Sequence, residues 1–239
     1  MLISNLLDLS SVFYKFAEFD KWYFDRLPTF KGHHNGYQTP SDERELYLEK
    51  NTKFLNEGSG RKVYKLSDRS VLKVAIDRFG IIQNKVEYSI LKRGNFSDLL
   101  PKVFDRSEDY SWIEVEFVTE VPGNEISELS GVDPEDLVDL MASRMKYSSF
   151  ENLILQRIRD WNNEIKFKKL NPYDPEIEIH FMKKNIERYT SYLDNKFLKK
   201  SDELIKLFKL NAREFALISN YGKSSSGNLV FLDLGVLSV

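Results

Sequence analysis

The run Val71-Leu72-Lys73-Val74-Ala75-Ile76 sets a lysine in the middle of an apolar strand. The side chain must emerge on one face of a buried sheet, and a buried ammonium group normally has an anionic partner or ligand. Upstream, Lys62-Val63-Tyr64-Lys65-Leu66 is a second strand-like run, joined to the first by the polar turn Ser67-Asp68-Arg69. The pattern predicts a β-hairpin whose second strand carries Lys73.

A helical segment, predicted from Ile81 to Arg93, follows the hairpin. Its apolar positions mark the face that packs onto the sheet, and they are Ile82, Val86, Ile90 and Leu91. Glu87 lies beside this face, so we expect its carboxylate to form an ion pair with Lys73. The alternative is that the two residues are unrelated surface charges, which contribute little.

The remainder of the chain divides into a β-rich half and a helical half. Strand-like runs follow at Leu99–Asp105 and Ser111–Val118. A final strand is expected at Asn228–Asp233. This order predicts an α+β fold with a cleft between its halves. From Asp133 onward, the spacing predicts helices over Pro134–Tyr147, Phe150–Leu170, Glu176–Leu193 and Ser201–Leu210, the last with Ser201 as its N-cap.

The composition limits the kinds of partner and environment. The 239 residues are 41% hydrophobic, which is enough for one sizeable core or two small lobes. With 35 Lys and Arg against 37 Asp and Glu, the net charge is −2, and no global field would recruit nucleic acid or an acidic membrane. The absence of cysteine excludes thiol chemistry and fits a cytoplasmic location. No signal peptide or transmembrane helix is expected.

Residues 1–43 are predicted to be a helical extension with an aromatic face, ending in a linker from Lys31 to Glu43. We expect the face to pack on a lobe, and the alternative is a separate docking site. His33, His34 and His180 lack metal-ligand spacing. The lysine-rich stretches near residues 166–169 and 196–200 are expected to be solvated helix faces rather than RNA contacts.

Transfer of a phosphoryl group from ATP requires a backbone cover over the phosphates, a fixed cation on them, and metal ligands opposite. The segment Glu57-Gly58-Ser59-Gly60-Arg61 stands at the start of the first strand, and its glycines would let the backbone approach a phosphate closely. Lys73 supplies the cation, and Glu87 the carboxylate that fixes it. The parts of such a site therefore occur in the required order.

The chain from residue 56 to residue 239 resembles the protein-kinase superfamily. Val71-Leu72-Lys73 is similar to the family's V-A-I-K strand, and Asp233-Leu234-Gly235 is similar to its D-F-G motif. Asn220 precedes Asp233 by 13 positions, with a strand-turn-strand between them, which is close to the family's spacing of its two metal-binding residues. The resemblance implies a two-lobed protein-kinase-like fold.

The resemblance also implies ligands and their residues. ATP would lie in the cleft, and Asn220 and Asp233 would hold Mg²⁺. Lys73 would contact the α- and β-phosphates, and the hinge beside adenine would run from Glu116 to Val118. The other implied nucleotide-binding residues are Gly58, Ser59, Gly60, Val63 and Val71.

By the same resemblance, residues 44–121 are the β-rich N-lobe and residues 122–239 are a minimal helical C-lobe that ends just after the D-L-G motif. The chain is also similar to small kinase-like proteins encoded by bacteriophages. In those proteins a Ser-Gly-Arg-x-Val-Tyr strand, a Gln-Asn helix and an Asn-aromatic-Gly loop recur. This second resemblance implies the cytoplasm of a bacterial host.

The chain departs from the kinase pattern at several positions. The family's three glycine positions fall on Asn56, Gly58 and Arg61, so that only the middle one is matched. The catalytic Asp of the family stands five positions before its metal-binding Asn, where this chain has Phe215, whose ring cannot accept a proton. We expect Phe215 to pack inward. The chain stops four residues after Gly235, without the family's activation segment.

We therefore expect a nucleotide-binding pseudokinase, or a weak atypical ATP-dependent phosphotransferase, that acts through another protein. The alternative is an active atypical kinase, or a nucleotidyl transferase, in which Glu214 serves as the base after a shift of the loop register. The implied catalytic residues are Lys73, Glu87, Asn220 and Asp233. Contacts with nucleic acid or membrane are not expected, and the sequence leaves the oligomeric state open.

Overall fold

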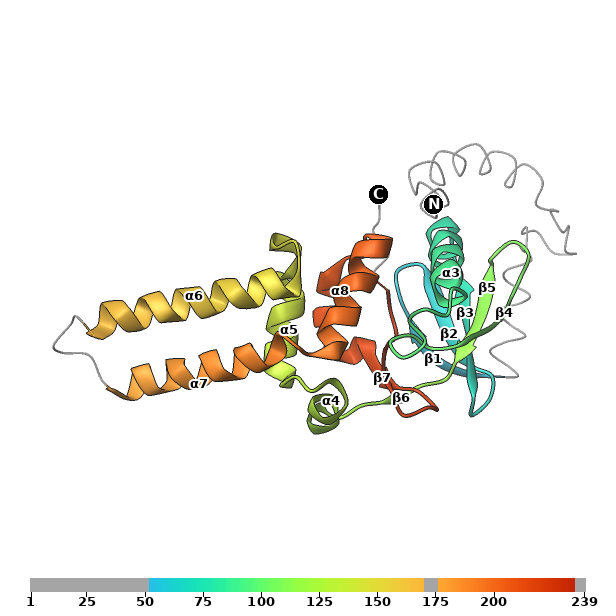
Figure 1. Cartoon of the computed structure of the whole chain (residues 1–239). Coiled ribbons are helices and arrows are strands. Elements are labelled where there is room, and N and C mark those ends of the chain that lie inside the picture. Colours follow the sequence, from blue (N-terminus) through green and yellow to red (C-terminus); the bar gives the residue numbers. More distant parts are fainter. Residues whose placement is uncertain (1–51, 170–175, 235–239) are drawn as a thin grey trace, which may run out of the picture. The chain divides into compact units, whose positions relative to one another are not determined.

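The structure is a computed structural model that describes residues 52–169 and 176–234. An antiparallel sheet of five strands has the order β1-β2-β3-β5-β4, and helix α3 packs against β3 and β5 (Figure 1). The bounds of these elements are β1 Lys53–Glu57, β2 Arg61–Lys65, β3 Ser70–Ala75, α3 Arg78–Leu91, β4 Val103–Arg106 and β5 Trp112–Glu116.

Strand β3 lies at the centre of the sheet because its residues can be buried on both faces. All of its residues except Ala75 are buried. The register sets Lys73 opposite Val63 of β2 and Ile113 of β5, which confirms the predicted hairpin. Strand β1 was not predicted, because it is exposed along its whole length and therefore shows no alternation of apolar and polar residues.

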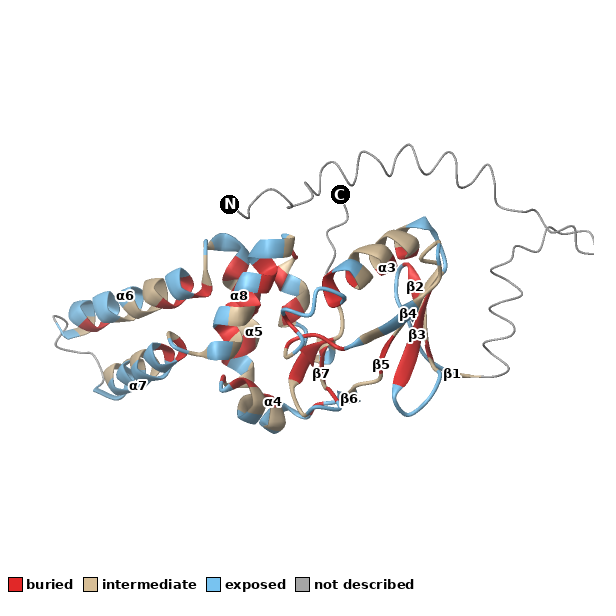
Figure 2. Ribbon diagram, turned by 45° about the vertical axis from the view of Figure 1, so that its right-hand side comes forward, coloured by how far each residue is buried: buried red, intermediate tan, exposed pale blue. Residues whose placement is uncertain are grey.

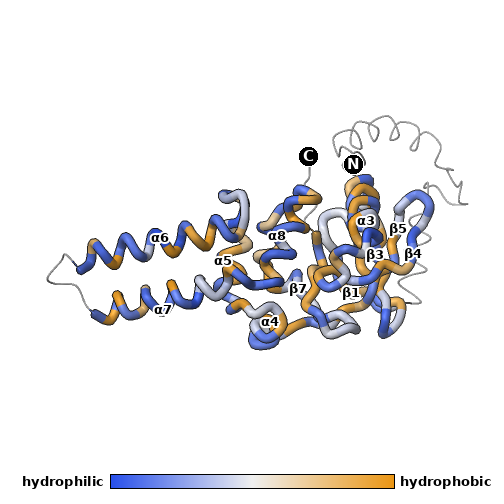
Figure 3. Tube along the Cα trace, viewed as in Figure 1, coloured by the Kyte–Doolittle hydropathy of each residue, from blue (hydrophilic) through white to orange (hydrophobic). Residues whose placement is uncertain are grey.

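The second half of the chain is mostly helical. Helices α6 and α7 run side by side away from α5, with apolar positions recurring along both (Figures 1 and 3). None of the helices in the described ranges is long and apolar enough to cross a membrane. The bounds are α4 Gly123–Ser130, α5 Pro134–Ser143, α6 Phe150–Lys169, α7 Glu176–Tyr192 and α8 Lys196–Phe208, with 3₁₀ turns η1 Arg144–Lys146, η2 Ala212–Ala216 and η3 Ile218–Asn220.

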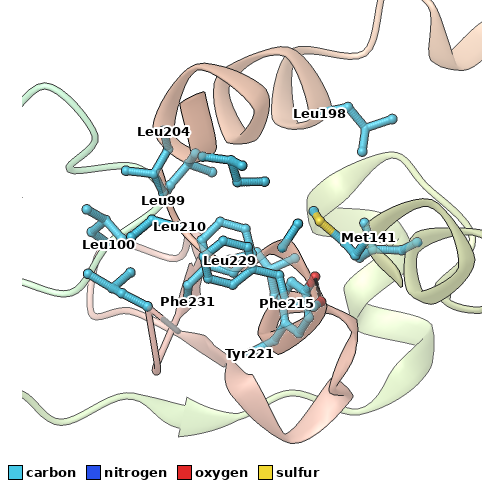
Figure 4. Packing of buried hydrophobic residues seen from close by; sticks show 14 of the residues in the cluster. Leu99, Leu100, Met141, Leu198, Leu204, Leu210, Phe215, Tyr221, Leu229 and Phe231 are labelled. Atoms are coloured by element: carbon cyan, nitrogen blue, oxygen red, sulfur yellow. Dashed lines mark hydrogen bonds between the residues drawn. The ribbon is translucent and has the colours of Figure 1, made fainter. Parts of the chain in front are cut away.

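A second, three-stranded sheet connects the two halves, and it consists of β6 (Thr119–Glu120), β7 (Tyr221–Lys223) and β8 (Leu229–Phe231). All residues of β8 are buried. Helices α5 and α8 also carry buried residues (Figure 2). One apolar cluster extends from this sheet to the helices, with Phe231 between Leu99 and Phe215 (Figure 4). The backbone N–H of Phe231 donates to the carbonyl oxygen of Leu99 at 2.9 Å, which fastens β8 to the segment before β4.

Some predicted boundaries were wrong. Helix α8 begins at Lys196, and its N-cap is Asn195, whose Oδ1 accepts from the Leu198 N–H at 2.9 Å. Ser201, the predicted cap, lies fully buried within the helix. Both residue types are good caps, and the one nearer the start of the apolar face is the one used. Helix α3 likewise begins three residues earlier than predicted, after the N-cap Asp77.

The α+β fold predicted from the sequence is confirmed, with a sheet-rich half followed by a helical half. Helix α4 was not predicted. Strand β4 covers only the end of the predicted run Leu99–Asp105, because Leu99 and Leu100 are buried in the apolar cluster instead. The predicted N-terminal helices and linker, the pair His33 and His34, and Gly235 all lie outside the described residues.

Candidate functional site

Lys73 of β3 forms the predicted ion pair with Glu87 of α3. The Lys73 Nζ lies 2.5 Å from Glu87 Oε1 and donates a second hydrogen bond to the carbonyl oxygen of Leu232 at 2.8 Å. The side chain of Glu87 is only 3% exposed, so the pair is largely shielded from water. The pair therefore joins the sheet, the helix and the segment that leads into Asp233.

Arg61 is a second cation on the same carboxylate, although it occupies a position at which the kinase loop pattern has a glycine. Its Nη1 donates to Glu87 Oε2 and lies 3.4 Å from Asn84 Oδ1, while its Nη2 lies 3.9 Å from Asp233 Oδ1. Arg61 is 8% exposed. A signal was present in the sequence, because alternate residues of a strand share a face and Arg61 stands two positions from Val63.

Asn84, one turn before Glu87 on α3, positions this cluster and was also missed as a site residue. It is fully buried, and its Nδ2 donates to the carbonyl oxygens of Lys73, at 3.3 Å, and Tyr110, at 2.9 Å. Its Oδ1 accepts from Arg61. One amide side chain thereby fixes α3 against the backbone of β3.

The cluster is electrostatically self-consistent. Burial alone would raise the pKa of Glu87, but the charges of Lys73 and Arg61 and their hydrogen bonds hold that pKa below its ordinary value. Burial alone would lower the pKa of Arg61, but the negative charges of Glu87 and Asp233 outweigh this effect and raise that pKa. Glu87 is therefore an anion in the folded protein, and Arg61 is a cation.

A cavity of about 310 Å³ opens beside this cluster, between the sheet and the segments that carry Asn220 and Asp233. Its volume falls within the range of small-molecule pockets. Glu87 lies behind Lys73, and Glu214 is not among the described residues that line the cavity. The site residues from the sequence analysis that line it are Gly58, Ser59, Gly60, Val63, Val71, Lys73, Glu116, Val118, Asn220 and Asp233.

The two glycines of the loop before β2 have different surroundings. A Cβ on Gly58 would meet nothing nearer than 3.9 Å, whereas one on Gly60 would lie 3.0 Å from the Gly80 backbone nitrogen. In turn, a Cβ on Gly80 would lie 1.9 Å from the Gly60 carbonyl oxygen. Gly80 is thus the glycine that the close approach of the two segments requires, Gly60 packs tightly against the start of α3, and Gly58 is the glycine that leaves open space.

The predicted hinge segment is tied to the second sheet. Glu116 is 4% exposed, and its carboxylate accepts from the backbone N–H groups of Ser225, at 2.7 Å, and Lys102, at 3.1 Å. Burial alone would raise the pKa of Glu116, but these hydrogen bonds lower it below its ordinary value. A Cβ on Gly222 would lie 2.6 Å from Val118 Cγ2, so a glycine lets β7 approach the hinge closely. Glu116 therefore has a structural role beside the cavity.

Asn220 and Asp233 present oxygen atoms of the kind that Mg²⁺ binds. Asn220 Nδ2 donates to the carbonyl oxygen of Glu214 at 2.8 Å, which leaves the amide oxygen as the group for a further ligand. Asp233 has a side chain that is 45% exposed. Mg²⁺ is usually held by one or two carboxylates together with substrate phosphates. Here the Arg61 guanidinium stands 3.9 Å from the Asp233 carboxylate and would repel a divalent cation, so the donor set does not fit the ion.

Phe215 packs inward as predicted. It is fully buried, and its ring stacks on Phe231 with the centroids 4.3 Å apart (Figure 4). Its carbonyl oxygen accepts from the Tyr221 hydroxyl, and burial raises the pKa of that tyrosine. The neighbouring Glu214 accepts from Asn211 Nδ2 at 3.4 Å.

These features define the class of fold as protein-kinase-like. A lysine on the third strand of an antiparallel sheet pairs with a glutamate of the following helix, and a cavity separates this pair from the Asn220 and Asp233 segments. The predicted kinase-like fold is confirmed for the described part of the chain.

The chain is similar to solved aminoglycoside phosphotransferase structures. The gentamicin complex of APH(2'')-IIa has a TM-score of 0.37 and 15% identity, covering 81% of this chain and 69% of that chain. The ADP-bound aminoglycoside phosphotransferase APH(2'')-Ib has a TM-score of 0.35 and 14% identity, covering 82% and 70%. The ternary complex of APH(2'')-IIa with streptomycin and ATP has a TM-score of 0.28 and 16% identity, covering 45% of this chain and 42% of that chain, less than half of its length. No protein-family model and no curated protein matches this chain.

Proposed function

We propose that this chain binds a nucleoside triphosphate in the cavity and is a pseudokinase, lacking the base that efficient phosphoryl transfer requires. The ion pair of Lys73 with Glu87 carries the proposal, because a carboxylate holds the lysine at the wall of a cavity of ligand size. A buried ammonium group held toward a cavity favours an anionic ligand. In kinases the equivalent lysine contacts the α- and β-phosphates.

The lining of the cavity supports one orientation of the nucleotide. Val63, Val71 and Val115 offer an apolar surface to the adenine ring, beside the hinge segment Glu116–Val118. Lys73 and the open backbone at Gly58 would then face the phosphates.

The absence of a base rests on Phe215 and Glu214. Phe215 is part of the apolar core, where its ring can neither accept a proton nor orient a hydroxyl group. The carboxylate of Glu214 interacts with Asn211, and Glu214 is not one of the described residues that line the cavity. No observation favours the alternative of an active kinase with Glu214 as its base.

Nucleotide binding is tested by thermal unfolding with ATP and with ADP. A ligand that binds only the folded state raises the melting temperature by mass action. Lys73→Met should abolish the increase, while Lys146→Met, at an exposed site away from the cavity, should retain it. The absence of any increase for the wild type at millimolar nucleotide would refute the proposal.

Transfer is tested separately with γ-labelled ATP. We expect the wild type to label neither itself nor generic acceptor proteins above background, and Glu214→Gln to change nothing. Robust transfer by the wild type that collapses in Glu214→Gln would establish the alternative, with Glu214 as the base.

We also infer that the output of the site is a contact with another protein, since a site without a base transfers phosphoryl groups slowly at best. We also propose, from the resemblance to kinase-like proteins of bacteriophages, that the chain is encoded by a bacteriophage and acts in the cytoplasm of a bacterial host. The supporting measurement is hydrogen exchange, in which ATP should change protection in helices beyond the cavity as well as in β1–β3. Protection changes confined to the residues that line the cavity would count against a partner-directed role.

A further inference from the structure

Arg61 stands where the kinase glycine loop has its third glycine, and its guanidinium enters the site instead of leaving space. Its Nη1 contacts Glu87, and its Nη2 reaches within 3.9 Å of Asp233 Oδ1. That second distance is longer than a hydrogen bond, so the guanidinium is held by Glu87 and only lies near Asp233. Arg61 is one of the residues that line the cavity.

The charges of the cluster explain what Arg61 changes. Lys73 alone would face the carboxylates of Glu87 and Asp233, and the group would carry a net negative charge that repels a phosphate. A kinase removes this negative charge with metal ions. With Arg61 present, two cations balance two carboxylates, so that a phosphate meets a neutral site with fixed donors.

Arg61 is also prepared for an anion by its geometry. Guanidinium groups offer donors in a planar fork that matches phosphate oxygens, and they stay charged at any physiological pH. Glu87 and Asn84 hold one of its nitrogens in place, which reduces the entropy that binding would cost. A divalent cation placed on Asp233, by contrast, would stand close to this positive charge and be repelled by it.

From this geometry we infer that Arg61 is a phosphate-binding residue, and that the site holds a nucleoside di- or triphosphate without a divalent cation. The inference rests on the proposed function, since it concerns the same cavity. It goes beyond that function by assigning to a side chain of this protein the charge that Mg²⁺ supplies in kinases.

The test is isothermal titration of ADP and ATP into the full-length wild type, once with excess EDTA and once with millimolar Mg²⁺. The two affinities should agree within about threefold, a difference well below the tenfold that corresponds to 1.4 kcal/mol. Arg61→Met should weaken binding in EDTA by about 10- to 100-fold, the loss expected for a hydrogen bond to a charged group. Arg61→Lys should retain part of the affinity, and Arg69→Met, on the exposed β2–β3 turn, should retain all of it.

The outcomes separate this inference from the proposed function. Binding by the wild type in Mg²⁺ but not in EDTA overturns the inference and leaves nucleotide binding intact. Binding in neither buffer overturns both. Binding in EDTA that is unchanged in Arg61→Met overturns the role of Arg61. If Arg61→Met does not fold, the affinities of the wild type in the two buffers still decide whether nucleotide binding needs a divalent cation, because that comparison requires no substitution.

Discussion

Replacing Glu87 by Gln should destabilise the protein far more than an ordinary substitution of a glutamate. The carboxylate is 3% exposed and serves Lys73 and Arg61 at the same time. Glutamine keeps the size of the side chain and removes the charge. Two buried cations then share a site with no full negative charge beside them except the half-exposed Asp233.

The magnitude follows from the burial of these groups. Removing one partner of a buried ion pair costs about 3–5 kcal/mol, because the remaining charge stays desolvated. In a domain of this size, each kcal/mol shifts the melting temperature by about 2–4 °C. We therefore expect Glu87→Gln to lower the melting temperature by about 6–20 °C. The exposed Glu108→Gln should change the free energy of unfolding by less than about 0.5 kcal/mol.

The assay is urea unfolding followed by circular dichroism for the wild type, Glu87→Gln, Arg61→Met and the double variant. Arg61→Met removes one of the two cations that lose their carboxylate partner Glu87 in Glu87→Gln. The free energy of unfolding of the double variant should therefore exceed the value expected from adding the two single changes by about 1–3 kcal/mol. Additivity within about 0.5 kcal/mol would refute the shared network. A loss of less than about 1 kcal/mol for Glu87→Gln, which is typical of surface ion pairs, would also refute the shared network.

Further predictions concern the core, the glycines and acid stability. Phe215→Ala should cost about 3–5 kcal/mol in urea unfolding, because the ring is fully buried against Phe231, and a loss below about 1 kcal/mol would contradict that packing. Gly80→Ala should be strongly destabilising, since its Cβ would lie 1.9 Å from a backbone oxygen, while Gly58→Ala should keep the wild-type melting temperature. A lower melting temperature for Gly58→Ala than for Gly80→Ala would exclude this arrangement of the loop. The pKa values of Glu87 and Glu116 are lower in the folded than in the unfolded protein, so the unfolded chain binds more protons in acid. Their contribution to the free energy of unfolding is therefore present above the ordinary pKa of 4.5 and is lost as the pH falls through their folded pKa values. Glu116→Gln should therefore flatten the acid limb of a stability–pH profile, and an unchanged limb would mean that the carboxylate is not hydrogen-bonded as found.

The centre of the site could be predicted because it depends on simple periodicities. An apolar strand interrupted by one lysine needs a partner, and the next helix offers a glutamate beside its apolar face. These two facts placed Lys73 against Glu87, which the structure confirms. The inward packing of Phe215 could be predicted for a similar reason, because burying an aromatic ring in an apolar segment is favourable.

The parts that could not be predicted depend on contacts between distant segments. Gly60 lines the cavity, but its carbonyl oxygen also lies 1.9 Å from the place of a Cβ on Gly80, and no local pattern encodes that close approach. Glu116 was expected only at the hinge, yet its carboxylate binds the backbone of Ser225, 109 positions away. The role of Arg61 could not be predicted from the family motif, which has a glycine at this position, because it depends on the face of β2 that turns toward Glu87.

The loop that carries Phe215 holds its neighbours through backbone atoms. The carbonyl oxygen of Glu214 holds the Asn220 amide, and that of Phe215 holds the Tyr221 hydroxyl. Because both hydrogen bonds use backbone atoms, the identity of the side chain at position 215 does not affect them, and a phenyl ring there adds core packing. Asp at this position would instead place a charge in the fully buried site that Phe215 fills, and burying an unpaired carboxylate is costly. Under the proposed function this loop orients Asn220 toward the nucleotide, and we expect that Phe215→Asp alone lowers stability without producing phosphoryl transfer.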